Sequence, residues 1–122
     1  MAALSIAFEA PDNAGGMCPS AGRPIDMVHL AHQTMGDKAL ELEVLQMFAR
    51  HARESMKELA ATQGEARAAA AHRLKGSAQS VGATAVGKAA GALEDDPADA
   101  AALASITAAV VEAENFILKL CR

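Results

Sequence analysis

The sequence predicts an all-α protein: an up-and-down antiparallel four-helix bundle with a short extra N-terminal helix. Hydrophobic residues make up 52% of the chain, many of them alanine, and aromatic residues only 2%, which favours closely packed helices over sheets. From Pro24 onward, apolar residues recur at spacings of three and four, the period of an amphipathic helix. Glycine or proline marks short turns between these segments, so consecutive helices are expected to run antiparallel.

The first 22 residues differ from the rest, and we expect an irregular or partly docked tail there. Residues 10–24, APDNAGGMCPSAGRP, are dense in Pro, Gly, Asn and Ser, which disfavour regular structure. The preceding LSIAF (4–8) alternates apolar with small or polar residues, a short extended pattern. The start has no basic region and contains Glu9, so it does not resemble a secretory signal. The helical domain is therefore assigned to residues 23–122, and the tail to 1–22.

Two helices are predicted in the first half of this domain. A short helix covers residues 25–35, with Asp26 at its start and Gly36 at its end. A long helix follows over about 37–62, and we expect Gly64 to terminate it. Its predicted core residues are Leu45, Phe48, Ala52, Met56 and Leu59, with Met47 as a further core side chain.

Three more helices complete the predicted bundle. They cover about 65–81, closed by Gly82, then 84–94, and finally 98–120. Pro97 interrupts the helical pattern, and Asp96 or Asp99 is the candidate N-cap of the last helix. Their predicted core residues are Leu74, Ala78 and Val81 in the first, Val86, Ala90 and Leu93 in the second, and Leu103, Ile106, Val110, Ala113, Ile117 and Leu120 in the third.

The helix over 65–81 carries a histidine that is predicted to face water. At about 100° per residue, His72 lies opposite the core residues of this helix. Lys75 and Gly76 follow at the i+3 and i+4 positions, which contact His72 on a helix surface, and Ala68 and Gln79 share this outer face. Glycine inside a helix costs about 1 kcal/mol relative to alanine, so Gly76 suggests close approach of another molecule. An exposed imidazole is a nucleophile near neutral pH, and an ammonium beside it stabilises incoming negative charge, which fits a phosphoryl group.

The stretch HRLKGSAQSVGA resembles the signature of histidine-containing phosphotransfer (HPt) domains, H-x-L-K-G-x-x-x-x-x-G. The matching residues are His72, Leu74, Lys75, Gly76 and Gly82. The resemblance implies a phosphorelay carrier: His72 exchanges a phosphoryl group with the aspartate of a response-regulator receiver domain or a hybrid histidine kinase. It implies that Lys75 stabilises the phosphoryl group and that the face with Gly76 receives the partner.

The same resemblance implies a protein that has no ATP-dependent kinase activity and no cofactor of its own, because the receiver supplies Mg²⁺. Ala68 and Gln79 are expected to belong to the docking face. Many members of the family carry a polar amide on the next helix near the histidine. Glu94 occupies roughly that place, so whether Glu94 or instead Lys88 assists the site is left open.

Some features of the sequence are also compatible with other functions. A helical adaptor could use the same face to bind a receiver or kinase without being phosphorylated. GATAVGKA (82–89) approaches a phosphate-binding loop, but Ala89 stands where the magnesium-binding hydroxyl belongs, and a helix rather than a strand precedes it. His29 and His32 form an HxxH pair, without a complete set of zinc ligands. The acidic run 94–96 is interpreted as a solvated loop.

Charge, cysteine content and hydropathy indicate which partners and which cellular location to expect. The formal net charge of −4 argues against a nucleic-acid partner, which selects basic surfaces. Cys18 and Cys121 lie near opposite ends without metal-binding spacing, as expected of free thiols in a reducing cytoplasm. No uninterrupted apolar run of membrane-spanning length occurs, so no membrane association is expected. We therefore expect a cytoplasmic protein, monomeric in solution.

Overall fold

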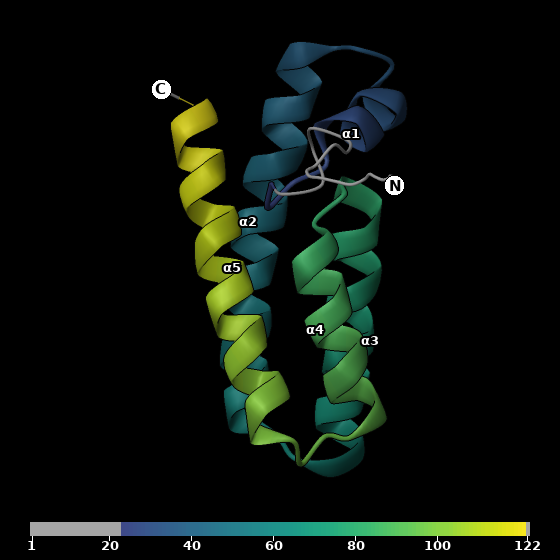
Figure 1. Ribbon diagram of the computed structural model, residues 1–122, viewed down its shortest axis with the longest axis vertical. Helices are drawn as coiled ribbons and strands as arrows, with labels where there is room; N and C mark the ends of the chain where they lie inside the picture. Colours follow the sequence, from purple (N-terminus) through teal and green to yellow (C-terminus); the bar gives the residue numbers. More distant parts are fainter. Residues whose placement is uncertain (1–22, 122) are drawn as a thin grey trace, which may run out of the picture.

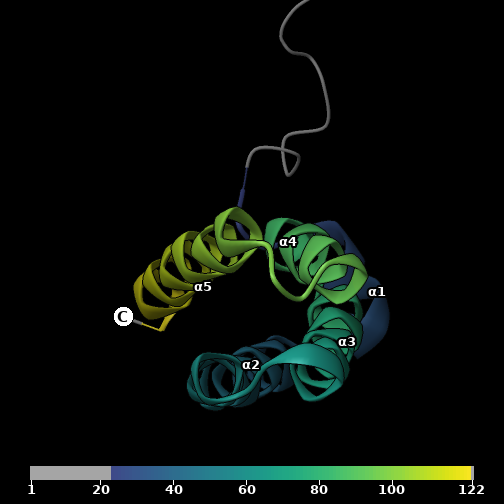
Figure 2. The same ribbon diagram turned by 90° about the horizontal axis from the view of Figure 1, so that it is seen from below.

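The computed structural model describes residues 23–121, and the tail assigned to residues 1–22 lies outside this part of the chain. All regular structure within it is helical, which confirms the predicted all-α class, and four long helices run up and down around a common core (Figures 1 and 2). A short helix lies across the end of the bundle (Figure 1). The helices are α1 (Met27–Thr34), α2 (Lys38–Ala61), α3 (Gly64–Val81), α4 (Thr84–Asp95) and α5 (Ala100–Leu120).

Aspartate side chains begin three of the five helices. Asp26 accepts hydrogen bonds from the backbone N–H groups of Val28 and His29, and so caps α1. Asp37 caps α2 in the same way, and Asp99 caps α5. Such caps satisfy N–H groups that have no partner inside the helix. The choice between two caps for the last helix therefore falls on Asp99, and α5 begins two residues later than predicted.

Glycines set the turns, though one of them differently from the prediction. Gly82 ends α3 with φ of 80°, in the left-handed region that glycine adopts without steric cost. Its carbonyl accepts a 2.8 Å hydrogen bond from the backbone N–H of Asp26, which fixes the start of α1 against the end of α3. Gly64 was expected to terminate α2, but this is wrong: α2 ends at Ala61, and Gly64, with φ of 58°, is the first residue of α3.

The core lies between the four long helices, each of which packs against its two neighbours. α2 contacts α3 and α5, and α4 contacts α3 and α5, so α5 lies diagonally across from α3 (Figure 2). Most predicted core residues are buried, including Leu45, Leu74 and Ile106. Met47 was expected in the core, but 57% of it is exposed on the outside of α2, and Leu120 is exposed as well.

Arg67 links two inter-helix connections at the end of the bundle that lies far from α1. Its guanidinium donates hydrogen bonds to two backbone carbonyls. Nε donates to Thr62 O at 2.8 Å, just after α2, and Nη1 donates to Pro97 O at 3.1 Å, in the α4–α5 turn. Arg67 thus ties together two connections that are 30 residues or more apart along the chain.

The last helix is unusually apolar. α5 is long and apolar enough to span a membrane by length and composition, with a mean hydropathy of 1.5 in its most apolar window. One face of it nevertheless lies in the bundle core, where Ile106, Val110 and Ile117 are buried. Only 28% of the apolar window is buried, however, so a large apolar share of α5 remains on the outside.

Candidate functional site

His72 projects from the middle of α3 into solvent, as the helical periodicity predicts. Its side chain is 65% exposed, while Leu74 and Ala78 on the opposite side of the helix are fully buried. Gly76 lies one turn further along the exposed side, and a Cβ atom added there would meet nothing within 4 Å. Ala68, one turn before His72, is half-buried. The imidazole therefore stands on an open surface with small residues one turn before it and one turn after it.

A carboxylate on the neighbouring helix holds one nitrogen of this imidazole. Nδ1 of His72 lies 2.8 Å from Oε2 of Glu94, in the last turn of α4. An ionised carboxylate can only accept hydrogen bonds, so Nδ1 carries the proton and donates it to Glu94. The neutral ring then has its lone pair on Nε2. Glu94 in this way selects the tautomer in which the outer nitrogen, Nε2, has its lone pair free.

Glu94 also binds the lysine of the motif. Nζ of Lys75 lies 2.9 Å from Oε1 of Glu94, so the two carboxylate oxygens serve Lys75 and His72 separately. The hydrogen bond from Lys75 is the largest cause that lowers the pKa of Glu94; burial opposes it, and His72 lowers the pKa further. Gly91 makes room on α4, because a Cβ there would approach Cδ of Lys75 to 3.4 Å. Glu94, Lys75 and His72 form one connected cluster.

The role of Glu94 corrects the interpretation of the acidic run as a solvated loop. Glu94 is helical and half-buried, and it is the central acceptor of the site. A signal for it is present in the sequence. His72 lies ten residues before Gly82, and Glu94 lies twelve residues after it. Two antiparallel helices joined by a tight turn at Gly82 bring residues at similar distances from the turn to the same level.

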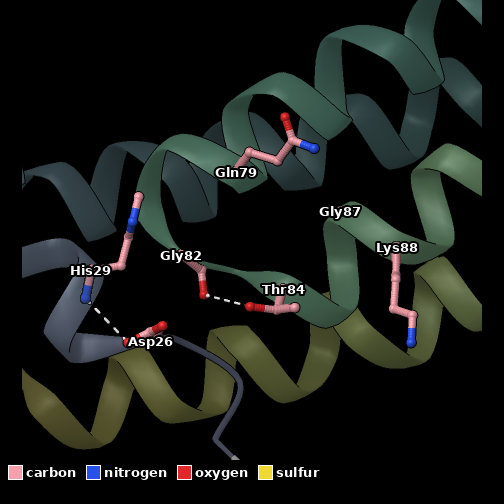
Figure 3. A pocket seen from close by; sticks show the side chains of 7 residues that line it. All are labelled: Asp26, His29, Gln79, Gly82, Thr84, Gly87 and Lys88. Atoms are coloured by element: carbon pink, nitrogen blue, oxygen red, sulfur yellow. Dashed lines mark hydrogen bonds between the residues drawn. The ribbon is translucent and has the colours of Figure 1, made fainter. Parts of the chain in front are cut away.

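Lys88 and Gln79 lie at a different part of the α3–α4 surface. Lys88 precedes Glu94 by six residues, about 9 Å along a helix, and does not join the His72 cluster. Gln79, two turns beyond His72, has its Cγ atom beside Gly87 of α4. Both residues line a hollow of about 300 Å³ at the junction of α1, α3 and α4 (Figure 3); its lining is Asp26, His29, Gln79, Gly82, Thr84, Gly87 and Lys88.

Four of the eight residues of the stretch that approaches a phosphate-binding loop line this hollow. In the structure Gly82 is the end of a helix, and residues 84–89 are the first turns of α4. No strand precedes the turn, and the hydroxyl of Thr84 faces the carbonyl of Gly82 at 3.4 Å. The arrangement is a helix–turn–helix connection and lacks the strand that a nucleotide-binding loop requires. Within residues 23–121, no three His, Cys, Asp or Glu side chains group as metal ligands.

A second hollow lies on the other side of the His72 face, between α2 and α3. It has a volume of about 340 Å³. Met47 and His51 border it from α2, and Ser77 and Ser80 from α3, with Val44, Phe48 and Val81 beneath them. Nearby, Arg73 and Glu58 form an ion pair that joins α3 to α2. This α2–α3 groove is largely apolar and begins within one residue of Gly76.

Comparison with known proteins agrees with the geometry. The family model described as "Hpt domain" matches residues 43–116, more than half of the chain. The matched part runs from α2 to near the end of α5 and contains His72, Lys75 and Glu94. No curated protein and no solved structure matches the sequence. Hpt domains carry phosphoryl groups on histidine in phosphorelays and are not kinases. The chain belongs to the Hpt domain family, because the family model matches most of its helical bundle, including the exposed histidine.

Proposed function

We propose that the protein is a phosphorelay carrier that accepts a phosphoryl group on Nε2 of His72 from a receiver aspartate and passes it to another. The observation that carries this proposal is the hydrogen bond between Nδ1 of His72 and Glu94 on an otherwise exposed imidazole. A solvated surface histidine without a role has no need of a fixed tautomer. Here the inner nitrogen is held by a carboxylate, and the outer nitrogen is left free.

The chemistry needs no proton to leave the site. Nε2 of His72 attacks phosphorus, a P–N bond forms, the P–O bond of the aspartyl phosphate breaks, and the aspartate leaves as a carboxylate. Nδ1 keeps its proton, so the ring gains positive charge, which the adjacent carboxylate of Glu94 stabilises. The same steps in reverse return the phosphoryl group to a receiver. We expect the receiver to supply the Mg²⁺ that this transfer requires.

Lys75 is proposed to stabilise the phosphoryl group. In the structure its ammonium is 2.9 Å from Oε1 of Glu94, and the whole side chain of Lys75 is 31% exposed. A phosphoryl group on Nε2 brings up to two negative charges to the surface next to it, and charge-assisted hydrogen bonds from an ammonium to phosphate oxygens are strong. Lys75 also offsets the repulsion between this phosphoryl group and the Glu94 carboxylate.

The receiver is proposed to dock over His72 and Gly76 and onto the α2–α3 groove. The absence of a side chain at Gly76 allows the partner backbone to approach, and 57% of Met47 is exposed at the border of the groove. The exposed lining of this groove is largely apolar, and contiguous apolar patches with polar residues at their edges typically mark interaction surfaces. Gln79 and Ala68 lie along the same side of α3 and are proposed to contact the partner at its edges.

Transfer from a phosphorylated receiver tests the proposal. Purified receiver domains of the same organism are phosphorylated with a labelled small-molecule donor and mixed with the protein. We expect label that is stable in base and labile in acid, and that disappears in His72→Gln. His32→Gln, which changes an exposed histidine on α1, is the matched control and should retain the label.

The alternative of an unphosphorylated adaptor makes a different prediction for the same experiment. An adaptor would bind receivers equally well with and without His72 and would take up no label from any of them. Binding without label in the wild-type protein would therefore overturn the carrier function.

A further inference from the structure

Gly91, in the second half of α4, is a glycine that neither a turn nor the packing of the helices requires. Its backbone is helical, and a Cβ atom added there would meet a single neighbour, Cδ of Lys75 at 3.4 Å. Gly87, one turn earlier, is different, because a Cβ atom there would meet Ala78 and Gln79 of α3 at 3.7 Å. Glycine is unfavourable inside a helix. What the missing side chain of Gly91 provides is therefore room for Lys75.

The side chain of Lys75 uses this room to lie against α4. It is 31% exposed, whereas the side chains of Lys38 and Lys57, which also form ion pairs, are 82% and 70% exposed. Methylene groups of lysine commonly pack against a protein surface while the ammonium reaches beyond them. Here they pass Gly91, and the ammonium ends 2.9 Å from Oε1 of Glu94, three residues further along α4.

We propose that Gly91 is a positioning residue of the phosphotransfer site, because its missing side chain lets Lys75 cross α4 and hold its ammonium on Glu94, beside His72. Gly91 contacts neither the phosphoryl group nor the partner, and it acts only through Lys75. Its role in transfer rests on the carrier function proposed above, whereas its effect on the contact between Lys75 and Glu94 does not.

This position of Lys75 serves phosphoryl transfer in two ways. Held on Glu94, the ammonium balances the carboxylate charge before a negatively charged phosphoryl group arrives. An ammonium has three N–H donors, so Lys75 can keep one hydrogen bond to Glu94 while the others bind phosphoryl oxygens. The course over Gly91 also takes the side chain toward α4, and the surface at Gly76, where a Cβ atom would meet nothing within 4 Å, stays open.

Gly91→Val removes this room and leaves the helix intact, since valine is no worse than glycine inside a helix. A β-branched side chain has one strongly preferred rotamer in a helix, so its two methyl groups have little freedom to move aside for Lys75. Gly91→Ala is the conservative variant, because a single Cβ atom at 3.4 Å makes an ordinary contact that the flexible end of Lys75 tolerates. Ala92→Val, at an exposed position of the same helix, is the matched control.

The carboxyl group of Glu94 reports on Lys75 without any receiver, because the hydrogen bond from Lys75 is the largest cause of its lowered pKa. In a ¹³C NMR titration of the full chain, Gly91→Val should raise the pKa of Glu94 as Lys75→Ala does. Gly91→Ala and Ala92→Val should keep the wild-type pKa. The rate of label transfer from a phosphorylated receiver should fall in Gly91→Val by the same factor as in Lys75→Ala. Added to Lys75→Ala, Gly91→Val should change neither quantity further.

A wild-type pKa of Glu94 in Gly91→Val would overturn the proposal. So would a further change when Gly91→Val is added to Lys75→Ala, because Gly91 would then act through the shape of α4 and not through Lys75. A raised pKa with undiminished transfer would reject Gly91 as a positioning residue of the reaction. If the wild-type protein takes up no label from any receiver, the carrier function itself fails, and the titration still shows whether Gly91 holds Lys75 on Glu94. Circular dichroism checks that both valine variants fold.

Discussion

Gly76 inside α3 and Gly82, the residue that ends this helix, should respond in opposite ways to the same substitution. At Gly76 the backbone is helical and a Cβ atom would meet nothing within 4 Å. Gly76→Ala should therefore gain the helix propensity difference, about 0.8–1 kcal/mol of unfolding free energy. For a domain of this size, 1 kcal/mol raises Tm by roughly 4–8 °C.

Gly82→Ala should destabilise the protein. Its φ of 80° lies in the left-handed region, and a Cβ atom would come to 2.9 Å from the carbonyl oxygen of Asp26. The left-handed conformation costs an L-residue about 1–2 kcal/mol, and the backbone contact adds to that cost, because relieving it disturbs the 2.8 Å hydrogen bond between Asp26 and Gly82. The two variants should therefore differ by about 3 kcal/mol in unfolding free energy, the sum of the gain at residue 76 and the loss at residue 82.

Urea unfolding followed by far-UV circular dichroism measures both changes, and transfer from a phosphorylated receiver separates stability from function. Gly76→Gln should also be at least as stable as the wild type, since glutamine is a good helix former. Its side chain stands where the receiver is proposed to dock, however, so transfer should be slow. A loss of stability in Gly76→Ala would refute the account of an open, outward position. Undiminished transfer in Gly76→Gln would refute close approach at this glycine.

The other predictions concern the cluster around His72 and Arg67 at the far end of the bundle. Glu94→Gln should slow phosphorylation of His72, because a neutral amide neither imposes the Nδ1–H tautomer nor balances positive charge on the ring. ¹⁵N NMR of the imidazole should show a change in the proportions of the two tautomers. An unchanged spectrum would contradict the role of Glu94. The pKa of Glu94 is lowered, so the ionised carboxylate should stabilise the fold above the ordinary glutamate pKa, and this stabilisation should be lost as the pH falls through the lowered pKa. The difference in unfolding free energy between wild type and Glu94→Gln, measured from neutral to acid pH, should therefore shrink as the pH falls. Lys75→Ala should leave the bundle folded but shorten the lifetime of phosphohistidine or slow its formation, and if both are unaltered Lys75 has no part in the reaction. Arg67→Met removes charged hydrogen bonds to two backbone carbonyls and should cost about 2 kcal/mol in urea unfolding, whereas Lys57→Met, on the exposed surface of α2, should cost little.

Much of the fold follows from local chemistry that can be recognised in the sequence. Aspartates at helix starts and glycine at the end of α3 act through hydrogen bonds and φ angles within a few residues of themselves. The predicted bounds of α3 and α4 are therefore within one residue of those observed. The outward direction of His72 is equally local, because it depends only on the 100° step of the helix relative to Leu74 and Ala78.

The errors have a common physical origin as well. Gly64 allows either the end of one helix or the start of the next, and the pattern of its neighbours does not distinguish the two. Periodicity alone does not decide whether Met47 is buried or exposed. The width of the buried stripe on α2 depends on how closely α3 and α5 approach this helix.

Helix positions and the exposure of His72 were thus determined by the sequence itself, because hydrogen bonding and periodicity act within one or two turns. Only the tertiary structure decided that Glu94 joins His72 to Lys75, that Gln79 and Lys88 border a separate hollow, and that a large apolar share of α5 is left outside. These depend on the rotation and spacing of helices far apart in the chain, which packing of the whole core sets.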